Sequence, residues 1–149
     1  MENLTLRMTK PEDREEYLAL AKEFYSSDAV MHPVPLKNFE RTFEELLRSD
    51  EYAACLMAEY GGAVAGYILI ARTYSQEAGG EAVWLEEIYV RPDFRGRGIG
   101  RAMIEEIMRL FPAARYRLEI EPDNRRAAAL YSRLGFCELG YGQMFLDKK

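Results

Sequence analysis

The first third of the chain moves from alternating to helical spacing of its apolar positions. Residues 4–8 alternate apolar and polar side chains, which is typical of a half-buried strand. Thr9 and Glu12 then have the spacing of a capping box before a helix. Two helices are predicted here, separated by an irregular segment at 26–35 with two prolines; their apolar positions are Tyr17, Leu20, Ala21, Phe24, Phe39, Phe43, Leu46 and Leu47.

The middle of the chain contains three apolar runs that predict strands. The runs 53–59 and 63–72 are joined by Tyr60-Gly61-Gly62, and glycine adopts the positive φ angles of tight hairpin turns at little cost. A polar turn at 75–80 leads to the third run, 82–90. We therefore expect an antiparallel meander of three strands.

The last third returns to helical spacing. A helix is predicted from the glycine-rich stretch after residue 90 to about Phe111, with a buried stripe made of Met103, Ile104, Ile107, Met108 and Phe111. A strand at 116–120 follows, and then a helix that is capped by Asp123 or Asn124 and ended by Gly135. Residues 136–145 are expected to supply closing strands. The whole pattern predicts a mixed sheet with helices on both faces.

Composition bounds the kind of protein. With 149 residues and 48% hydrophobic content, the chain is expected to form one domain over 1–149 with a substantial core. A net charge of -5 argues against nonspecific binding of nucleic acid. No apolar run approaches the length of a membrane span, and a cytoplasmic location is expected. Cys55 and Cys137 lack the spacing of a disulfide framework or a metal site, and both are expected to be buried.

The stretch 95–101 carries the strongest chemical signal. Gly96, Gly98 and Gly100 lie between a predicted strand and a predicted helix, and that order exposes backbone amides to an anion at a helix N-terminus. Four arginines, at 91, 95, 97 and 101, suit a ligand with several phosphates. A dinucleotide-binding loop would need a further glycine at position 101, and a Walker A loop would need Gly-Lys-Ser/Thr. Neither is present.

Two motifs resemble those of the GNAT superfamily of N-acetyltransferases. The pattern Arg95-x-x-Gly98-x-Gly100 resembles the superfamily's pyrophosphate loop, and 124–136, Asn-x-x-Ala-x-x-Leu-Tyr-x-x-x-Gly-Phe, resembles its second motif. The resemblance implies an α/β (α+β) fold with a mixed, mostly antiparallel central sheet of six to seven strands and helices on both faces. It also implies transfer of an acetyl group from acetyl-CoA to a primary amine, by direct attack in a ternary complex and without a metal.

The resemblance also assigns a cofactor site. The pyrophosphate is expected on the backbone amides of 97–101, and the pantetheine arm along the strand that ends at Val90. The strands at 82–90 and 116–120 are expected to splay apart to admit that arm, and the N–H of Val90 or a neighbour to stabilise the oxyanion. The full expected set is Ile88, Tyr89, Val90, Arg95, Gly96, Arg97, Gly98, Ile99, Gly100, Arg101, Asn124 and Tyr131.

The candidate catalytic residues are one tyrosine and two glutamates. Tyr131 matches the motif's general acid, which protonates the departing thiolate. Glu86 stands where diamine acetyltransferases carry a carboxylate that activates the amine, whereas Glu119 resembles the base position of ribosomal-protein N-terminal acetyltransferases. Ordered water is a third route for the proton. Glu86 and Glu87 are consecutive, so on a regular strand they would face opposite sides and only one would reach the cleft.

Several alternatives remain open at this level. A module that binds acyl-CoA without turning it over would fit the same loop, although degenerate members often lack the tyrosine or the strand carboxylate, and this chain has both. The amine acceptor, small molecule or peptide, is not determined. His32 lies in the connection that borders the acceptor side in the family, and a lone loop histidine is more often structural than catalytic. C-terminal strands of such domains often pair between subunits, so a homodimer is compatible with the resemblance.

Overall fold

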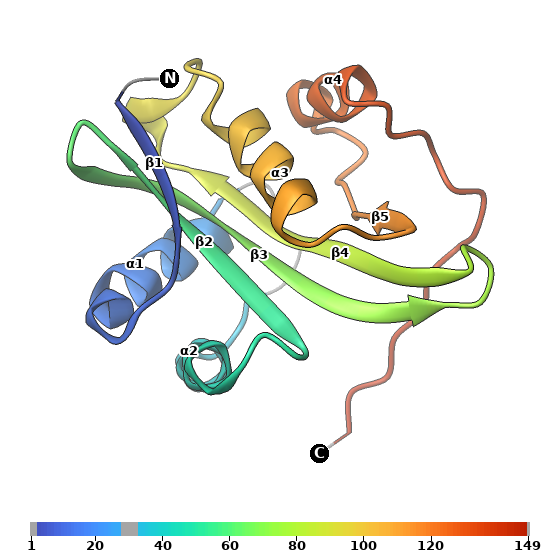
Figure 1. Ribbon diagram of the computed structural model, residues 1–149, viewed down its shortest axis with the longest axis horizontal. Coiled ribbons are helices and arrows are strands. Elements are labelled where there is room, and N and C mark those ends of the chain that lie inside the picture. The colour runs from blue at the N-terminus through green and yellow to red at the C-terminus, as the bar shows by residue number, and fades with distance from the viewer. Residues whose placement is uncertain (1–2, 28–32, 149) are drawn as a thin grey trace.

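This computed structural model describes residues 3–27 and 33–148. They are arranged around a five-stranded sheet (Figure 1). The strands lie in chain order, and they are β1 (Leu4–Met8), β2 (Ala53–Tyr60), β3 (Ala63–Ser75), β4 (Gly80–Val90) and β5 (Arg115–Arg117). Neighbouring strands pair antiparallel from β1 to β4, whereas β5 runs parallel to β4. The predicted mixed sheet is confirmed in these terms.

Helices cover both faces of the sheet, as predicted (Figure 1). On one face lie α1 (Arg14–Tyr25) and α2 (Leu36–Arg48), which bury an aromatic layer that includes Tyr17, Phe43 and Tyr67. On the other face lie α3 (Ile99–Leu110) and α4 (Arg125–Arg133). Because the two layers bury opposite faces of β2, β3 and β4, the positions of these three strands are fixed from both sides.

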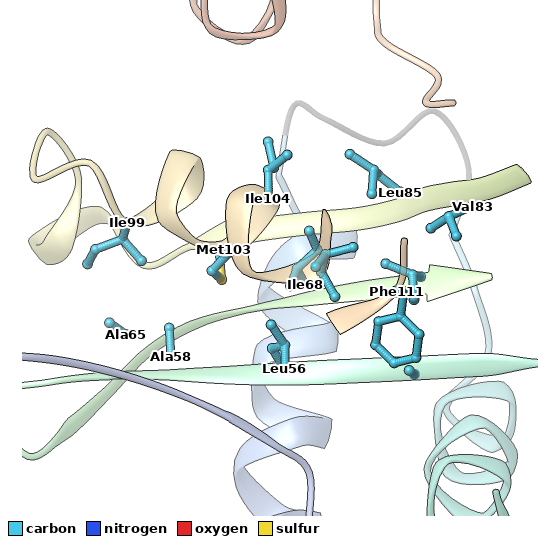
Figure 2. Close-up of a cluster of buried hydrophobic side chains, with 13 residues drawn as sticks. Leu56, Ala58, Ala65, Ile68, Val83, Leu85, Ile99, Met103, Ile104 and Phe111 are labelled. Atoms are coloured by element: carbon cyan, nitrogen blue, oxygen red, sulfur yellow. The ribbon is translucent and has the colours of Figure 1, made fainter. Parts of the chain in front are cut away.

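The main core lies between the sheet and α3 (Figure 2). Ile99, Met103, Ile104 and Ile107 form the inner face of α3, with at most 2% of each residue exposed. They pack on the sheet through Leu56, Ile68 and Val83, among others. Full burial of each such side chain contributes about 1.5 to 3 kcal/mol, so this layer anchors α3 firmly against β2, β3 and β4. The predicted stripe is therefore confirmed for Met103, Ile104, Ile107 and Phe111, whereas Met108 is only partly buried.

Two local predictions are wrong. The helix start uses Asp13 rather than Glu12: the backbone N–H of Lys10 donates to Asp13 Oδ2 at 2.9 Å, and Arg7 donates to both carboxylate oxygens of Asp13. Asp13 is the acid that can be buried because the Arg7 guanidinium compensates its charge. Cys137 is exposed rather than buried, while Cys55 is buried as expected.

The sheet is also smaller than the expected six to seven strands. β5 ends at Arg117 instead of Ile120, and residues 136–145 form no strand in the described chain. Since 118–120 leave the sheet, the closing segment has no adjacent backbone to pair with, and its apolar residues Leu139, Tyr141 and Met144 stay exposed.

Two further findings concern the surroundings of the sheet. His32, whose contact with substrate the sequence leaves open, lies outside the described residues. In the described ranges, every helix is too short or too polar to cross a bilayer.

Candidate active site

β4 loses its neighbour on one side halfway along its length. It pairs with β5 only over Ala82–Trp84, opposite Arg115–Arg117, and in the described chain no strand continues that pairing from Leu85 to Val90. Figure 1 shows the chain leaving the sheet after β5 toward α4. The second half of β4, from Leu85 to Val90, therefore has one edge without a neighbouring strand, which we call the free edge.

The register with β3 shows which backbone groups lie on this edge. Arg91 donates its backbone N–H to Ala65 O at 2.7 Å, and Val90 is paired with Gly66. Because hydrogen-bonded and non-hydrogen-bonded pairs alternate in an antiparallel ladder, the N–H and C=O of Val90 point away from β3. The same alternation directs those of Ile88 to the free edge. This edge offers donors and acceptors to a ligand that lies where β5 would have continued.

Gly66 is a site residue that the sequence reasoning missed. A Cβ atom there would lie 2.2 Å from Tyr89 O, well inside van der Waals contact. Only glycine therefore allows β3 to approach the end of β4 so closely. The available signal was an isolated glycine inside a strand pattern, which indicates a close backbone approach.

The glycine loop connects the end of β4 to α3. After a 3₁₀ turn at Pro92–Phe94, Gly96 and Gly98 have φ angles of 77° and 78°, a region that favours glycine. The first bond within α3 runs from Ala102 N to Gly98 O, at 3.0 Å. The amides of Ile99, Gly100 and Arg101 consequently have no acceptor within the helix, which is the arrangement that an anion site at a helix N-terminus requires.

The arginines of this region do not share one role. Arg91 is bound to Glu16 and Glu23 of α1, and it is therefore already compensated. Arg95 donates from Nε to Val90 O at 2.8 Å and lies over the Tyr89 ring. Arg97 lies over the Tyr60 ring and is exposed, so its charge remains available beside the loop.

A further arginine lies near the loop, and it was not expected from the sequence. A Cβ atom on Gly96 would lie 3.9 Å from Nη2 of Arg126, which belongs to the first turn of α4. The two motifs are thus adjacent in space, which sequence order alone could not show. Asn124 caps α4 by accepting from Ala127 N at 3.2 Å, as predicted.

Tyr131 and Glu119 line the same hollow. A cavity of about 810 Å³ lies between β5, α4 and the segment 134–143, and both residues contribute to its wall. Burial raises the pKa of Tyr131, so its hydroxyl keeps its proton at neutral pH. No hydrogen-bond partner of that hydroxyl occurs in the part of the chain that the structure describes. Glu86 and the glycine loop do not line this hollow.

The two consecutive glutamates occupy a β-bulge. Leu69 is paired with Glu87 and Ile70 with Leu85, so Glu86 is the extra residue of β4. The bulge changes the alternation: Leu85 and Ile88 both pack on the α3 side. The expectation of simple opposite facing is therefore wrong, because it assumed a regular strand.

The environments of these two carboxylates differ. Glu87 is partly buried and accepts hydrogen bonds from the hydroxyls of Tyr25 and, at 2.5 Å, Tyr67. Desolvation raises the pKa of Glu87, and the two phenols oppose that rise. Glu86 remains accessible to solvent, but its pKa is raised. The largest cause is desolvation by the surrounding protein, followed by repulsion from the charges of Glu87 and Glu119. Glu86 and Glu119 are therefore close enough to interact.

Comparisons with known proteins identify the family. The model of the acetyltransferase (GNAT) family matches residues 14–136. Mouse thialysine N-epsilon-acetyltransferase is 29% identical, over 99% of this chain and 92% of that protein. The N-alpha-acetyltransferase RimI of Mycobacterium tuberculosis is 34% identical, over 56% of this chain and 51% of its own.

A solved structure has the same fold. AAC(6')-Iy in complex with the bisubstrate analogue CoA-S-monomethyl-acetylneamine superimposes with a TM-score of 0.79, covering 98% of each chain at 22% identity. The chain belongs to the GNAT acetyltransferase family and is an acyltransferase.

Two glycine substitutions test the loop geometry. Gly98→Ala should lower the free energy of unfolding by about 1 to 2 kcal/mol, because an alanine at positive φ is strained. Gly100→Ala is the matched control, since its added methyl would meet Leu130 at an ordinary 3.7 Å within a regular helix. Urea unfolding should show it to be unchanged or slightly more stable. Equal destabilisation of both variants would contradict the assigned loop conformation.

Proposed function

We propose that this protein transfers an acetyl group from acetyl-CoA to a primary amine by direct attack in a ternary complex, with 1–149 acting as one domain. The observation that carries the proposal is the free edge of β4, whose Ile88 and Val90 backbone groups lead directly into the anion site at the start of α3. An extended ligand with phosphates at one end and amides along its arm fits this arrangement.

The residues at the loop fit the phosphate end of coenzyme A. The amides of 99–101 and the exposed guanidinium of Arg97 offer donors and positive charge to the pyrophosphate. Arg95 holds Val90 O and lies over Tyr89, which fixes the junction between loop and strand. Asn124 keeps the start of α4, and with it Arg126, beside the loop.

Two groups would assist the bond changes at the thioester. As the C–N bond forms and the C–S bond breaks, the Val90 N–H donates to the carbonyl oxygen that gains negative charge, a contribution of about 3 kcal/mol in sites of this kind. Tyr131 donates its hydroxyl proton to the departing sulfur and recovers a proton from solvent. A tyrosine phenol is protonated at neutral pH, so Tyr131 has a proton to give.

Glu86 would accept the proton that the attacking amine loses. It is accessible to solvent, lies at the bulge beside the free edge, and its pKa is raised toward the range that suits a general base. Glu119 remains the competing candidate because it shares a hollow with Tyr131. Neither residue forms an ion pair within the described ranges, so each carboxylate is available to a cationic acceptor.

The acceptor is proposed only as a primary amine. The relatives' names mention thialysine and protein N-alpha groups, and one neighbour holds an acetylneamine analogue, which are different amines. The carboxylates of Glu86, Glu87 and Glu119 favour an acceptor with positive charge. A sensor that only binds acyl-CoA is the second candidate, and the retained Tyr131 and Glu86 disfavour it.

An assay of thiol release from acetyl-CoA tests the reaction. A panel of polyamines, amino acids, aminoglycosides and N-terminal peptides should include acceptors that stimulate release by the wild type. Tyr131→Phe should lower that rate roughly 100-fold or more, because the sulfur then departs without a proton donor. Tyr74→Phe, at a phenol 77% exposed on β3, should retain full activity. Coenzyme binding without release for any amine would favour the sensor.

Substitution of the two glutamates identifies the base. Glu86→Gln should lower the rate roughly 100-fold near neutral pH, since only the small fraction of already neutral amine then reacts. Wild-type activity should fall as the pH drops through the raised pKa of Glu86, because protonation removes the acceptor of the amine's proton. In the variant this step should disappear, leaving a rate that rises until the amine itself is neutral. If Glu119→Gln loses activity in this way and Glu86→Gln does not, the role of general base belongs to Glu119.

We also propose that two copies associate through the C-terminal segment. Tyr141, Met144 and Leu146 are 68%, 99% and 79% exposed, and large exposed apolar side chains commonly mark an interface. Sedimentation equilibrium should detect a dimer that is lost when residues 139–149 are removed, and a monomeric full-length chain would refute the proposal.

A further inference from the structure

One ion-pair network connects the helix layer of α1 to the junction between β4 and the glycine loop. Arg91, the first residue after β4, donates from Nε and Nη2 to the carboxylate of Glu23, with the shortest contact at 3.0 Å. Its Nη1 donates to Val64 O at 3.0 Å. The guanidinium is thus held by α1 on one side and by β3 on the other.

Glu23 has a second contact on the same strand. The hydroxyl of Tyr89 donates to Glu23 Oε1 at 3.2 Å. Tyr89 immediately precedes Val90, whose N–H lies on the free edge, and its ring lies under the guanidinium of Arg95. One carboxylate of α1 therefore fixes the two residues that flank Val90 in the sequence.

The partners of Glu23 make this a junction rather than an ordinary surface pair. Arg91 has 23% of its side chain exposed, and its backbone N–H is also fixed, to Ala65 O at 2.7 Å. The loop that leads to Gly96 and Gly98 departs from Arg91, through the bond from Phe94 N to Arg91 O at 2.9 Å. A shift of Arg91 would therefore move both the strand end and the start of the loop.

We propose that Glu23 is a positioning residue for coenzyme binding: through Arg91 and Tyr89 it holds the end of β4 and the start of the glycine loop in register. This inference rests on the proposed function, because it assumes that the loop and the free edge bind coenzyme A. Glu16 has a lesser part, since it contacts the Arg91 guanidinium at 3.1 Å, whereas the Tyr89 hydroxyl donates to Glu23.

Calorimetric titration of the protein with coenzyme A tests this role without requiring an acceptor. Glu23→Gln should raise the Kd roughly fivefold to tenfold, because charge-assisted bonds to Arg91 become neutral ones while the shape of the side chain is kept. Arg91→Gln should have a similar effect. The double variant should bind within about twofold of the weaker single variant, since both substitutions break the same interaction.

Two controls separate positioning from a general loss of stability. Phe43→Leu lowers packing in the aromatic layer, at a residue of α2 that is 1% exposed and whose ring lies 5.4 Å from that of Tyr17. Glu40→Gln removes an exposed ion pair between α1 and α2. Both should leave the Kd for coenzyme A unchanged, although Phe43→Leu should lower the Tm.

The outcomes are distinguishable. Weaker binding in Glu23→Gln but not in Phe43→Leu supports the inference. If Glu23→Gln binds coenzyme A as tightly as the wild type does, the inference is overturned. It is also overturned if Phe43→Leu weakens binding in proportion to its lowered Tm. Either result leaves the proposed function intact. A wild type that does not bind coenzyme A overturns the proposed function and, with it, this inference.

Discussion

The separation of β4 from β5 is the constraint on which the rest of the site depends. Three residues of parallel pairing hold the two strands together, and beyond them Ile88 and Val90 direct their backbone groups to a side without a neighbouring strand. An unpaired backbone edge is unfavourable when buried and needs water or a ligand to satisfy it. The free edge is stable only because α3, the aromatic layer under α1 and the close approach at Gly66 hold β4 from its other sides.

The same constraint explains where the charged residues lie. Arg91 could serve a phosphate by its position in the sequence, but its bonds to Glu23 and Val64 O commit it to the structure of the junction. Arg97 has no such anionic partner in the described chain, and its charge stays on the exposed side of the loop. Arg91 and Arg95 thus hold the junction, whereas the charge of Arg97 stays on the exposed side of the loop, and the loop can present its amides only while its origin is fixed.

The sequence allowed most of the fold and the outline of the site to be predicted, for identifiable reasons. The Gly61-Gly62 hairpin, the inner face of α3 and the cap at Asn124 arise from local spacing, which a single sequence contains. The bulge at Glu86, the close contact at Gly66 and the partner of Arg91 arise from pairing between distant segments. No local pattern determines such a register, so the facing of Glu86 and Glu87 was predicted wrongly.

The C-terminal segment is a second case in which pairing between distant segments could not be predicted from the sequence. Its composition is suitable for strands, but a strand forms only where a neighbouring backbone can pair with it, and 118–120 have left the sheet. Tyr131 and residues of this segment line the same hollow, so the environment of the proposed acid depends on how the segment is placed. The glycine loop and the edge of β4 do not line that hollow, so the segment bears on the proposed proton donor and not on the amides at the start of α3. A change in the position of the segment would therefore alter the surroundings of Tyr131 before those of the glycine loop.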